Sequence, residues 1–349
     1  MKGDPSIEHS SMEIGIYSLA DLRPNLQTGI TISSKQRLQE IIEAAKLADE
    51  ADLDIFGVGE HHRLDYTISA PPIVLSAISQ VTKRIRLTSA TTVLNTVDPV
   101  RLFEEFATLD LLSNGRAEII AGRGAFLESF PLFGYDLAHY DELFEENIEL
   151  FMKLNGQERI SWRGRFRPEL LDAEISPRPI QKNIPLWIGV GGSSESAARA
   201  GRLGTGLVLV ILDGNANQFK PFIDRYRQSA IQAGHSPEDL KVGVTGHVYI
   251  SETTQQAREE FVPYHLSYWG YNPFDKICKD DIAKKALFVG SSQQIIENIL
   301  QQYELFGHQR FIAQMDIGGM PFKKVADNIE RLATDVAPIV RRETKNSKN

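Results

Sequence analysis

The feature that most restricts the fold is a regular alternation of short apolar segments with segments of helical periodicity. In the helical segments, apolar residues recur three and four positions apart, as at Leu38, Ile41 and Ala45. Apolar strands that alternate with helices are typical of a parallel sheet covered by helices, and eight such units close a TIM barrel. The sequence therefore predicts an α/β fold with a single (β/α)8 TIM barrel. The eight predicted strands span 12–19, 53–59, 85–94, 117–124, 184–192, 206–212, 240–251 and 310–319.

Two connections are longer than the loops of compact domains usually are. They span about 155–182 and 251–287, after the fourth and the seventh predicted strands. Each is either a peripheral insertion or a lid over a pocket, and the sequence leaves both readings open. The barrel domain is expected to occupy 12–340, between a polar N-terminal tail (1–11) and a polar C-terminal tail (341–349).

Charge and composition argue against several classes of partner. The formal net charge is -8 at pH 7, which repels polyphosphate, so neither nucleic acid nor an anionic membrane is expected to bind. No apolar run approaches the roughly 18 to 20 residues that span a bilayer, and the N-terminus lacks the apolar centre of a signal peptide. The single cysteine, Cys278, cannot form an internal disulfide. Together these features predict a cytoplasmic protein.

In an α/β barrel the ligand binds at the carboxyl ends of the strands, so the residues there are candidates for the pocket lining. They are Tyr17 to Leu19; Glu60, His61 and His62; Ala90 to Val93; Arg123 to Phe126; Gly191 to Ser196; Leu212 and Asp213; and Asp316 to Gly319.

A glycine pair and a serine, Gly191, Gly192 and Ser193, lead from the fifth predicted strand into a helix. Glycines let the backbone approach a ligand closely, and the start of a helix offers unpaired N–H groups. This turn is either a phosphate-binding site, for which Arg123 would supply the opposite charge, or an ordinary glycine turn with a serine cap.

The stretch GVGEHH (57–62) ends in two adjacent histidines. Neighbouring residues of a strand face opposite sides, so His61 and His62 are not expected to bind one metal ion, and no third ligand is spaced nearby. Two readings remain: one imidazole faces the pocket as a hydrogen-bonding or proton-carrying group, or both histidines are structural.

Five stretches carry a resemblance to a known family. They are GVGEHH; TKRIRLTSATTVLNTVDPVRLFEEFATLDLLSNGRAEIIAGRG (82–124); PLWIGVGGSSESAARAGRLG (185–204); FVGSSQQIIENIL (288–300); and RFIAQMDIGGMP (310–321). Together they closely resemble the bacterial luciferase-like flavin-dependent monooxygenase family over roughly 13–340. The segment 98–124 is the most specific, because it keeps Pro-Val-Arg, Leu-Asp-Leu-Leu-Ser and Gly-Arg in register.

The resemblance implies a TIM barrel with FMN at the carboxyl ends of the strands. His61 matches the pocket histidine of the family and would be the catalytic residue. The Ala90-Thr91 step falls where the family has a non-prolyl cis peptide beneath the flavin ring, and Arg123 matches the arginine that binds the phosphate. The residues implied for cofactor binding are Ala90, Thr91, Arg123, Gly191, Gly192 and Ser193; no metal site is implied.

The implied activity is a monooxygenase that uses reduced FMN and O₂ to oxidise a small organic substrate, an FMN-dependent oxidoreductase acting on paired donors with incorporation of molecular oxygen. No nicotinamide-binding fingerprint is present, so reduced flavin is expected from a separate flavin reductase, and similar barrels suggest a homodimer. Two alternatives stay open: a deazaflavin-dependent hydride-transfer oxidoreductase, and a flavin-binding protein without turnover. The sequence does not identify the substrate.

Overall fold

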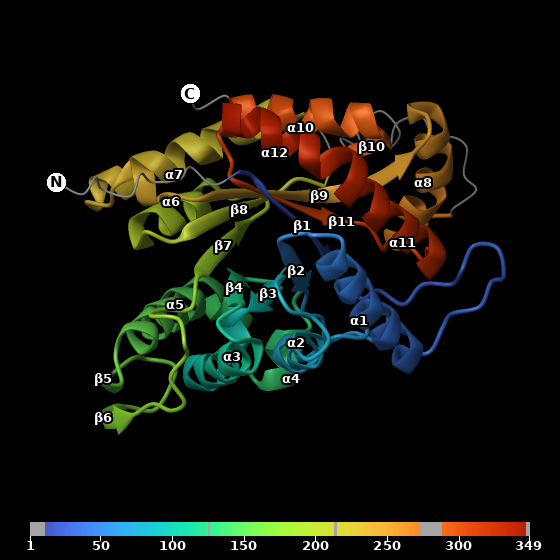
Figure 1. Ribbon diagram of the computed structural model, residues 1–349. Helices are drawn as coiled ribbons and strands as arrows, with labels where there is room; N and C mark the ends of the chain where they lie inside the picture. The colour runs from blue at the N-terminus through green and yellow to red at the C-terminus, as the bar shows by residue number, and fades with distance from the viewer. Residues whose placement is uncertain (1–10, 125, 213–214, 273–287, 347–349) are drawn as a thin grey trace.

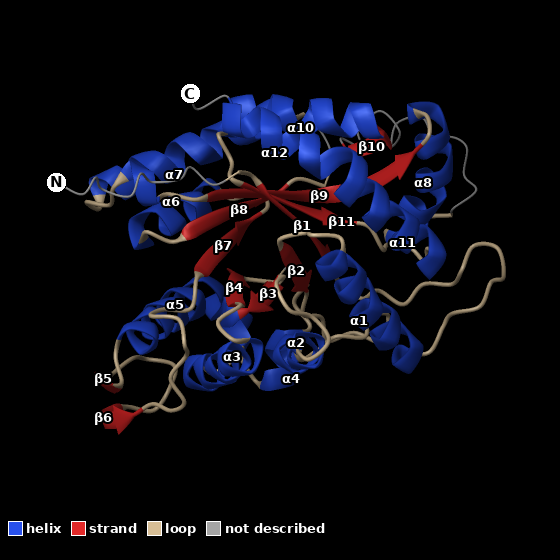
Figure 2. Cartoon of the chain, viewed as in Figure 1, coloured by secondary structure: helices blue, strands red, loops and turns tan. Residues whose placement is uncertain are grey.

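The chain forms one closed barrel of parallel strands, with helices around the outside (Figures 1 and 2). The structure, a computed structural model, describes residues 11–124, 126–212, 215–272 and 288–346. β1 pairs with β2 and with β11, and the pairing of β8 with β9 completes the ring, which confirms the predicted (β/α)8 TIM barrel. The barrel strands are β1 (Glu13–Ser18), β2 (Ile55–Val58), β3 (Arg86–Val93), β4 (Ala117–Gly122), β7 (Leu186–Val190), β8 (Gly206–Val210), β9 (Val242–Ser251) and β11 (Arg310–Gln314).

Helices fill the connections between the strands and cover the outer surface of the barrel (Figure 2). In α3, Asp98 caps the helix by accepting from the Val100 amide at 2.9 Å, and Asn114 ends it in the left-handed conformation. Among the described residues, no helix is long and apolar enough to cross a membrane. The helices are α1 (Ser34–Glu50), α2 (Pro71–Ser79), α3 (Pro99–Ser113), α4 (Ser129–Phe133), α5 (Tyr140–Gly156), α6 (Ser194–Leu203), α7 (Lys220–Gln232), α8 (Thr254–Tyr268), α10 (Ser292–Phe306), α11 (Phe322–Arg331) and α12 (Ala337–Asn346).

Both long connections have regular structure of their own. The first holds a two-stranded antiparallel sheet, β5 (Arg159–Trp162) with β6 (Leu170–Glu174), which lies apart from the barrel strands in Figure 1. The second begins with α8 and ends at β10 (Phe288–Ser291), a short strand parallel to the far end of β9. Residues 1–10, Asp213 and Cys278 lie outside the described residues.

The C-terminal boundary predicted at 341 is wrong for residues 341–346, because α12 continues to Asn346. Val340 and Thr344 are buried at a spacing of four, and the Arg341 guanidinium lies 2.7 Å from the Asp54 carboxylate. The polar composition of this segment therefore concealed an amphipathic helix whose narrow buried face packs on the barrel.

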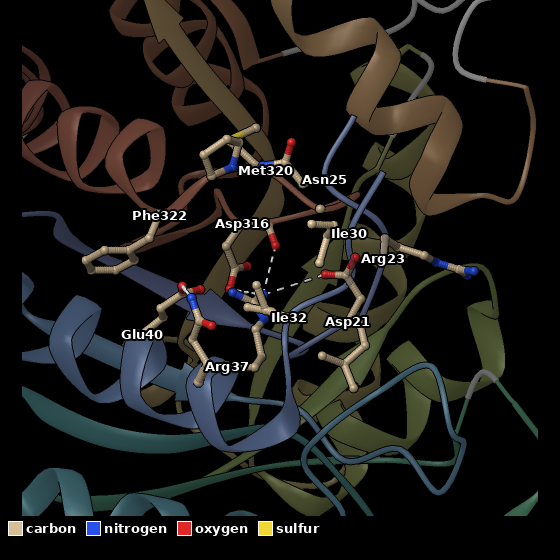
Figure 3. A pocket seen from close by; sticks show the side chains of 14 residues that line it. Asp21, Arg23, Asn25, Ile30, Ile32, Arg37, Glu40, Asp316, Met320 and Phe322 are labelled. Atoms are coloured by element: carbon tan, nitrogen blue, oxygen red, sulfur yellow. Dashed lines mark hydrogen bonds and ion pairs between the residues drawn. The ribbon is translucent and has the colours of Figure 1, made fainter. Parts of the chain in front are cut away.

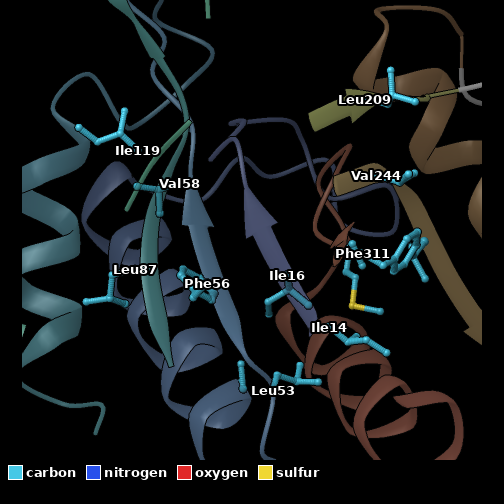
Figure 4. Packing of buried hydrophobic residues seen from close by; sticks show 14 of the residues in the cluster. Ile14, Ile16, Leu53, Phe56, Val58, Leu87, Ile119, Leu209, Val244 and Phe311 are labelled. Atoms are coloured by element: carbon cyan, nitrogen blue, oxygen red, sulfur yellow. The ribbon is translucent and has the colours of Figure 1, made fainter. Parts of the chain in front are cut away.

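Side chains of the strands alternate between two layers of the core. Ile14 and Ile16 of β1 and Phe56 of β2 belong to the large cluster between strands and helices (Figure 4). Inside the barrel, the Glu118 carboxylate accepts from Arg310 at 2.6 Å, and the Arg310 guanidinium lies 4.1 Å from the centre of the Trp187 ring. These three side chains come from the amino-terminal halves of their strands and fill that end of the barrel.

Candidate active site

A cavity of about 320 Å³ lies at the carboxyl ends of the barrel strands. Its walls are mostly aliphatic, with Ile120, Val208 and Ile312 among them, and Tyr268 and Trp269 from the end of α8 add aromatic rings. The second long connection therefore contributes to the pocket wall. Residues 155–182 of the first connection do not line this cavity.

The Ala90-Thr91 step of β3 lies in the cavity wall, and its peptide bond is cis, as the resemblance implied. The neighbouring strands leave space for it. A Cβ at Gly122 of β4 would lie 2.6 Å from the Thr91 hydroxyl oxygen, and a Cβ at Gly189 of β7 would lie 3.1 Å from the Thr91 methyl carbon. Glycine at both positions thus leaves room for the Thr91 side chain over β4 and β7.

His61 also lines the cavity, and aromatic side chains hold its ring. The imidazole stacks on Tyr66 with ring centres 4.0 Å apart, and Phe126 lies 5.5 Å away. Burial lowers the pKa of His61 to about 4, and the nearby Glu128 carboxylate only partly offsets this. Its Nδ1 atom is buried and has no hydrogen-bond partner within the described part of the chain. At neutral pH this side chain is therefore an uncharged imidazole with spare hydrogen-bonding capacity.

His62 has different surroundings and does not line the cavity. Its Nε2 atom lies 2.8 Å from a Glu60 oxygen, and its ring meets the edge of Phe133. The other Glu60 oxygen accepts from the Val93 amide at 2.9 Å. His62 thus supports a carboxylate that ties the end of β2 to the end of β3. The described residues include no cluster of three or more His, Cys, Asp or Glu side chains suited to a metal ion.

Arg123 follows β4, and its guanidinium shares the carboxylate of Asp141 with a second arginine, Arg199. Its Nη1 atom lies 2.5 Å from Asp141 on α5, and its guanidinium lies 5.1 Å from the Tyr140 ring centre. The same Asp141 oxygen lies 3.8 Å from Nη2 of Arg199, a residue of α6. Arg199 is buried and donates through Nε to Glu145, whereas its Nη1 atom has no hydrogen-bond partner among the described residues. We call Arg123, Asp141 and Arg199 the cationic corner.

The predicted turn at 191–193 begins the helix that carries Arg199. Ser193 caps α6 by accepting from the Ser196 amide at 3.3 Å. A Cβ at Gly192 would meet no atom within 4 Å, and one at Gly191 would meet only Val210, at 4.0 Å, so the space beside this helix start is open. No hydrogen bond joins Arg123 to the turn within the described residues. Arg123 is linked to α6 indirectly, because Asp141 lies close to both Arg123 and Arg199.

The prediction that Asp316 to Gly319 line the pocket is wrong. Asp316 borders a separate hollow of about 200 Å³ (Figure 3), where its carboxylate accepts from Ser18 at 2.5 Å and from Arg37 at 2.7 Å. The Arg37 guanidinium also lies 3.7 Å from Asp21. Strand β11 ends at Gln314, so Asp316 lies beyond the strand, in the segment that leads to α11. Arg123 and the 191–193 turn are not among the residues that line the cavity, while Gly124 and Gly189, which lie close to them in the chain, do line it.

Sequence reasoning missed two polar residues of the cavity, Thr245 of β9 and Gln314 of β11. Both lie within the segments expected as strands, several residues before their predicted ends. The sequence offered only a partial signal, a polar residue at an otherwise apolar position: in VGVTGHVYIS (242–251), Thr245 and His247 both interrupt the apolar pattern, but only Thr245 lines the cavity.

Comparisons with known proteins agree with this geometry. The flavin-dependent trigonelline monooxygenase, oxygenase component, of Acinetobacter baylyi is 23% identical over 88% of this chain and 91% of its own length. The F420-dependent glucose-6-phosphate dehydrogenase of Amycolatopsis mediterranei is 28% identical over 62% of this chain and 66% of its own. The oxygenating constituent of 3,6-diketocamphane monooxygenase from Pseudomonas putida, solved with FMN, superposes with a TM-score of 0.76 at 19% identity, covering 94% of this chain and 98% of its own. A family model described as luciferase-like monooxygenase matches residues 12–310, and the chain therefore belongs to that family.

Proposed function

We propose that this protein is the oxygenase of a two-component system, which uses reduced FMN and O₂ to oxidise a small organic substrate. The observation that carries the proposal is a mostly apolar cavity at the strand ends, together with the cationic corner, whose Arg123 directly precedes the cavity-lining Gly124. An apolar cavity suits a flat ring and an organic substrate, and a pair of guanidiniums next to a helix start suits a phosphate.

The residues present fit FMN. Arg123 would bind the phosphate together with the backbone amides at Gly191 and Gly192 and the Ser193 hydroxyl, where the helix start is open. Ala90 and Thr91 would lie against the ring, because their cis step is part of the cavity wall.

When bound, reduced FMN supplies the electrons that activate O₂, so that one oxygen atom enters the substrate and the other leaves as water. The protein contributes position and the exclusion of water, since most of the cavity wall is apolar. His61 would be the catalytic residue: its neutral imidazole can donate or accept one hydrogen bond at a reacting oxygen. A relative named an oxygenase component supports a separate flavin reductase as partner. We further expect a homodimer in the cytoplasm.

The first experiment is a titration of the purified protein with FMN, read from the visible spectrum and the quenching of flavin fluorescence. Arg123→Ala should weaken FMN binding at least tenfold, because it removes a charge-assisted contact. Arg202→Ala is the matched control, since Arg202 lies on the same helix as Arg199 and shares Glu145 with it, but among the described residues no ion pair joins Arg202 to Asp141. Absence of any spectral change at millimolar FMN would contradict the proposal.

The second experiment measures oxygen consumption with chemically reduced FMN and a panel of candidate substrates. His61→Ala should reduce turnover while FMN affinity stays within a few-fold of the wild-type value. Unchanged turnover would show that His61 has no catalytic role.

A deazaflavin-dependent hydride-transfer enzyme is the second candidate, because the relative from Amycolatopsis mediterranei is named an F420-dependent dehydrogenase. The same spectral titration with F420 in place of FMN distinguishes the two coenzymes. A bound flavin without oxygen consumption across the whole panel would instead indicate a flavin-binding protein without turnover.

A further inference from the structure

We propose that Tyr17, Thr245 and Gln314 recognise the hydrogen-bond-accepting group of an uncharged substrate, and that the cavity discriminates against charged molecules. We call these three residues the neutral polar cluster. The inference rests on the proposed function, because the proposed function places the flavin ring against the opposite wall of the cavity.

The neutral polar cluster spans three strands on one side of the barrel. Tyr17 of β1 and Gln314 of β11 are cross-strand partners, and the Tyr17 hydroxyl donates to the Gln314 side-chain oxygen at 3.1 Å. Thr245 of β9 pairs with Ile312 of β11. In the closed strand order, β9 lies four strands away from β3 in either direction, so Thr245 faces the wall that carries the Ala90-Thr91 step.

The cluster has unused donors at the cavity surface. Gln314 Nε2 and Thr245 Oγ1 are buried and make no hydrogen bond of good geometry with any described residue, although Thr245 lies near the Tyr17 phenol and Gln314 near the neutral His247 ring. Gln314 is 0% exposed and Thr245 6% exposed, and both residues line the cavity. The Tyr17 proton is directed to the Gln314 oxygen, and the Thr245 hydroxyl lies close enough to the Tyr17 oxygen to interact with it, so a ligand would meet the Gln314 amide N–H and a hydroxyl that can turn from Tyr17 to the ligand. An unsatisfied buried donor is costly, so an acceptor such as a carbonyl oxygen would be bound favourably here.

Among the described residues that line the cavity, none is a lysine or arginine that could balance the charge of an anionic ligand. His61 is uncharged at neutral pH, and burial raises the pKa of Tyr17, so its phenol also stays neutral. Glu60 is the one carboxylate among the described lining residues, and its two oxygens are engaged by His62 and by the Val93 amide.

A carboxylate or sulfonate group would therefore lose its hydration in the cavity without gaining a counter-ion, and an ammonium group would have to compete with His62 and the Val93 amide for the Glu60 oxygens. The substrate class that fits is a neutral, largely apolar molecule with one acceptor, such as a ketone, ester or amide. Its apolar part would pack on the aliphatic wall, for example on Val208 and Ile312.

Calorimetric titration of FMN-loaded protein at pH 7.5 tests this with three ligands of equal chain length: 2-octanone, octanoate and octylammonium. We expect 2-octanone to bind at least tenfold more tightly than either ion. Thr245→Val should weaken ketone binding about fivefold, and Thr245→Ser, which keeps the hydroxyl, should retain it. Thr96→Val is the matched control, because Thr96 is also 6% exposed with an unpaired hydroxyl but does not line the cavity.

Three outcomes would overturn the inference: no binding of 2-octanone, equal or tighter binding of octanoate or octylammonium, and a Thr245→Val variant that loses affinity for FMN instead of the ketone. The last result would assign the cluster to the coenzyme. Wild-type protein that takes up no FMN would contradict the proposed function and this inference together, whereas a loss of ketone preference in protein that binds FMN contradicts this inference alone.

Discussion

Lowering the pH should protonate the His61 imidazole only near pH 4 in the folded protein, because burial depresses its pKa from 6.5 to about 4. Roughly 2.5 pKa units correspond to about 3 kcal/mol of preference for the neutral form. At pH 6, on the order of 1% of the folded molecules would carry the proton on this ring. Any role of His61 in turnover at pH 6 to 8 is therefore that of a neutral hydrogen-bonding group.

The same shift predicts how this residue affects stability. Above about pH 6.5 the imidazole is neutral in both the folded and the unfolded chain. As the pH falls below 6.5, the unfolded chain binds a proton that the folded protein excludes until about pH 4. The free energy of unfolding of the wild type should therefore fall, relative to His61→Gln, by up to about 3 kcal/mol between these two values.

Two measurements check this reasoning. Imidazole proton resonances of the folded protein, assigned by comparison with His61→Gln, should give a midpoint for this ring near pH 4. Urea unfolding of both proteins from pH 7 to 5 should show the widening difference in free energy. A midpoint between pH 6 and 7, or parallel stability profiles, would refute the argument that burial dominates this site.

Three further predictions concern buried residues of the barrel outside the candidate active site. Glu118→Gln should lower the free energy of unfolding by about 3–5 kcal/mol in urea, because it leaves the buried Arg310 guanidinium without its main counter-charge. Gly318→Ala should lower the melting temperature far more than Gly270→Ala, since both have positive φ but only at Gly318 would the Cβ lie 1.9 Å from a backbone carbonyl oxygen. Asp21→Asn should stabilise the protein by up to about 3 kcal/mol at pH 8 and lose that advantage near pH 4. The reason is that burial raises the pKa of Asp21 to about 6, so the buried carboxylate is costly to charge above that pH. Equal urea midpoints for variant and wild type at both pH values would contradict this.

The barrel could be predicted from the sequence because the same pattern of strand and helix is repeated along the chain. Each strand is a short apolar run, each helix has its own periodicity, and eight repetitions leave few other folds. The helical structure of segment 341–346 was missed because the buried face of its helix is marked by Ala337, Val340 and Thr344, and only the last of these, a polar residue, lies within the segment.

The candidate site was accessible only in part. GVGEHH and the 191–193 turn could be found because they follow directly on apolar runs. Thr245 and Gln314 could not be placed, because the residue of each strand that reaches the cavity depends on how far neighbouring strands are staggered. Thr245 is only the fourth residue of a ten-residue strand, whereas Gln314 is the last residue of β11. That stagger is set by pairing across the whole barrel and has no local sequence signal.

The carboxylate of Asp141 already occupies the space between two guanidiniums. An anion that enters there gains only the difference between a new ion pair and the one it replaces, instead of the full attraction of a bare positive charge. Such an arrangement favours an occupant that arrives and departs with each catalytic cycle over one that is retained for the lifetime of the protein.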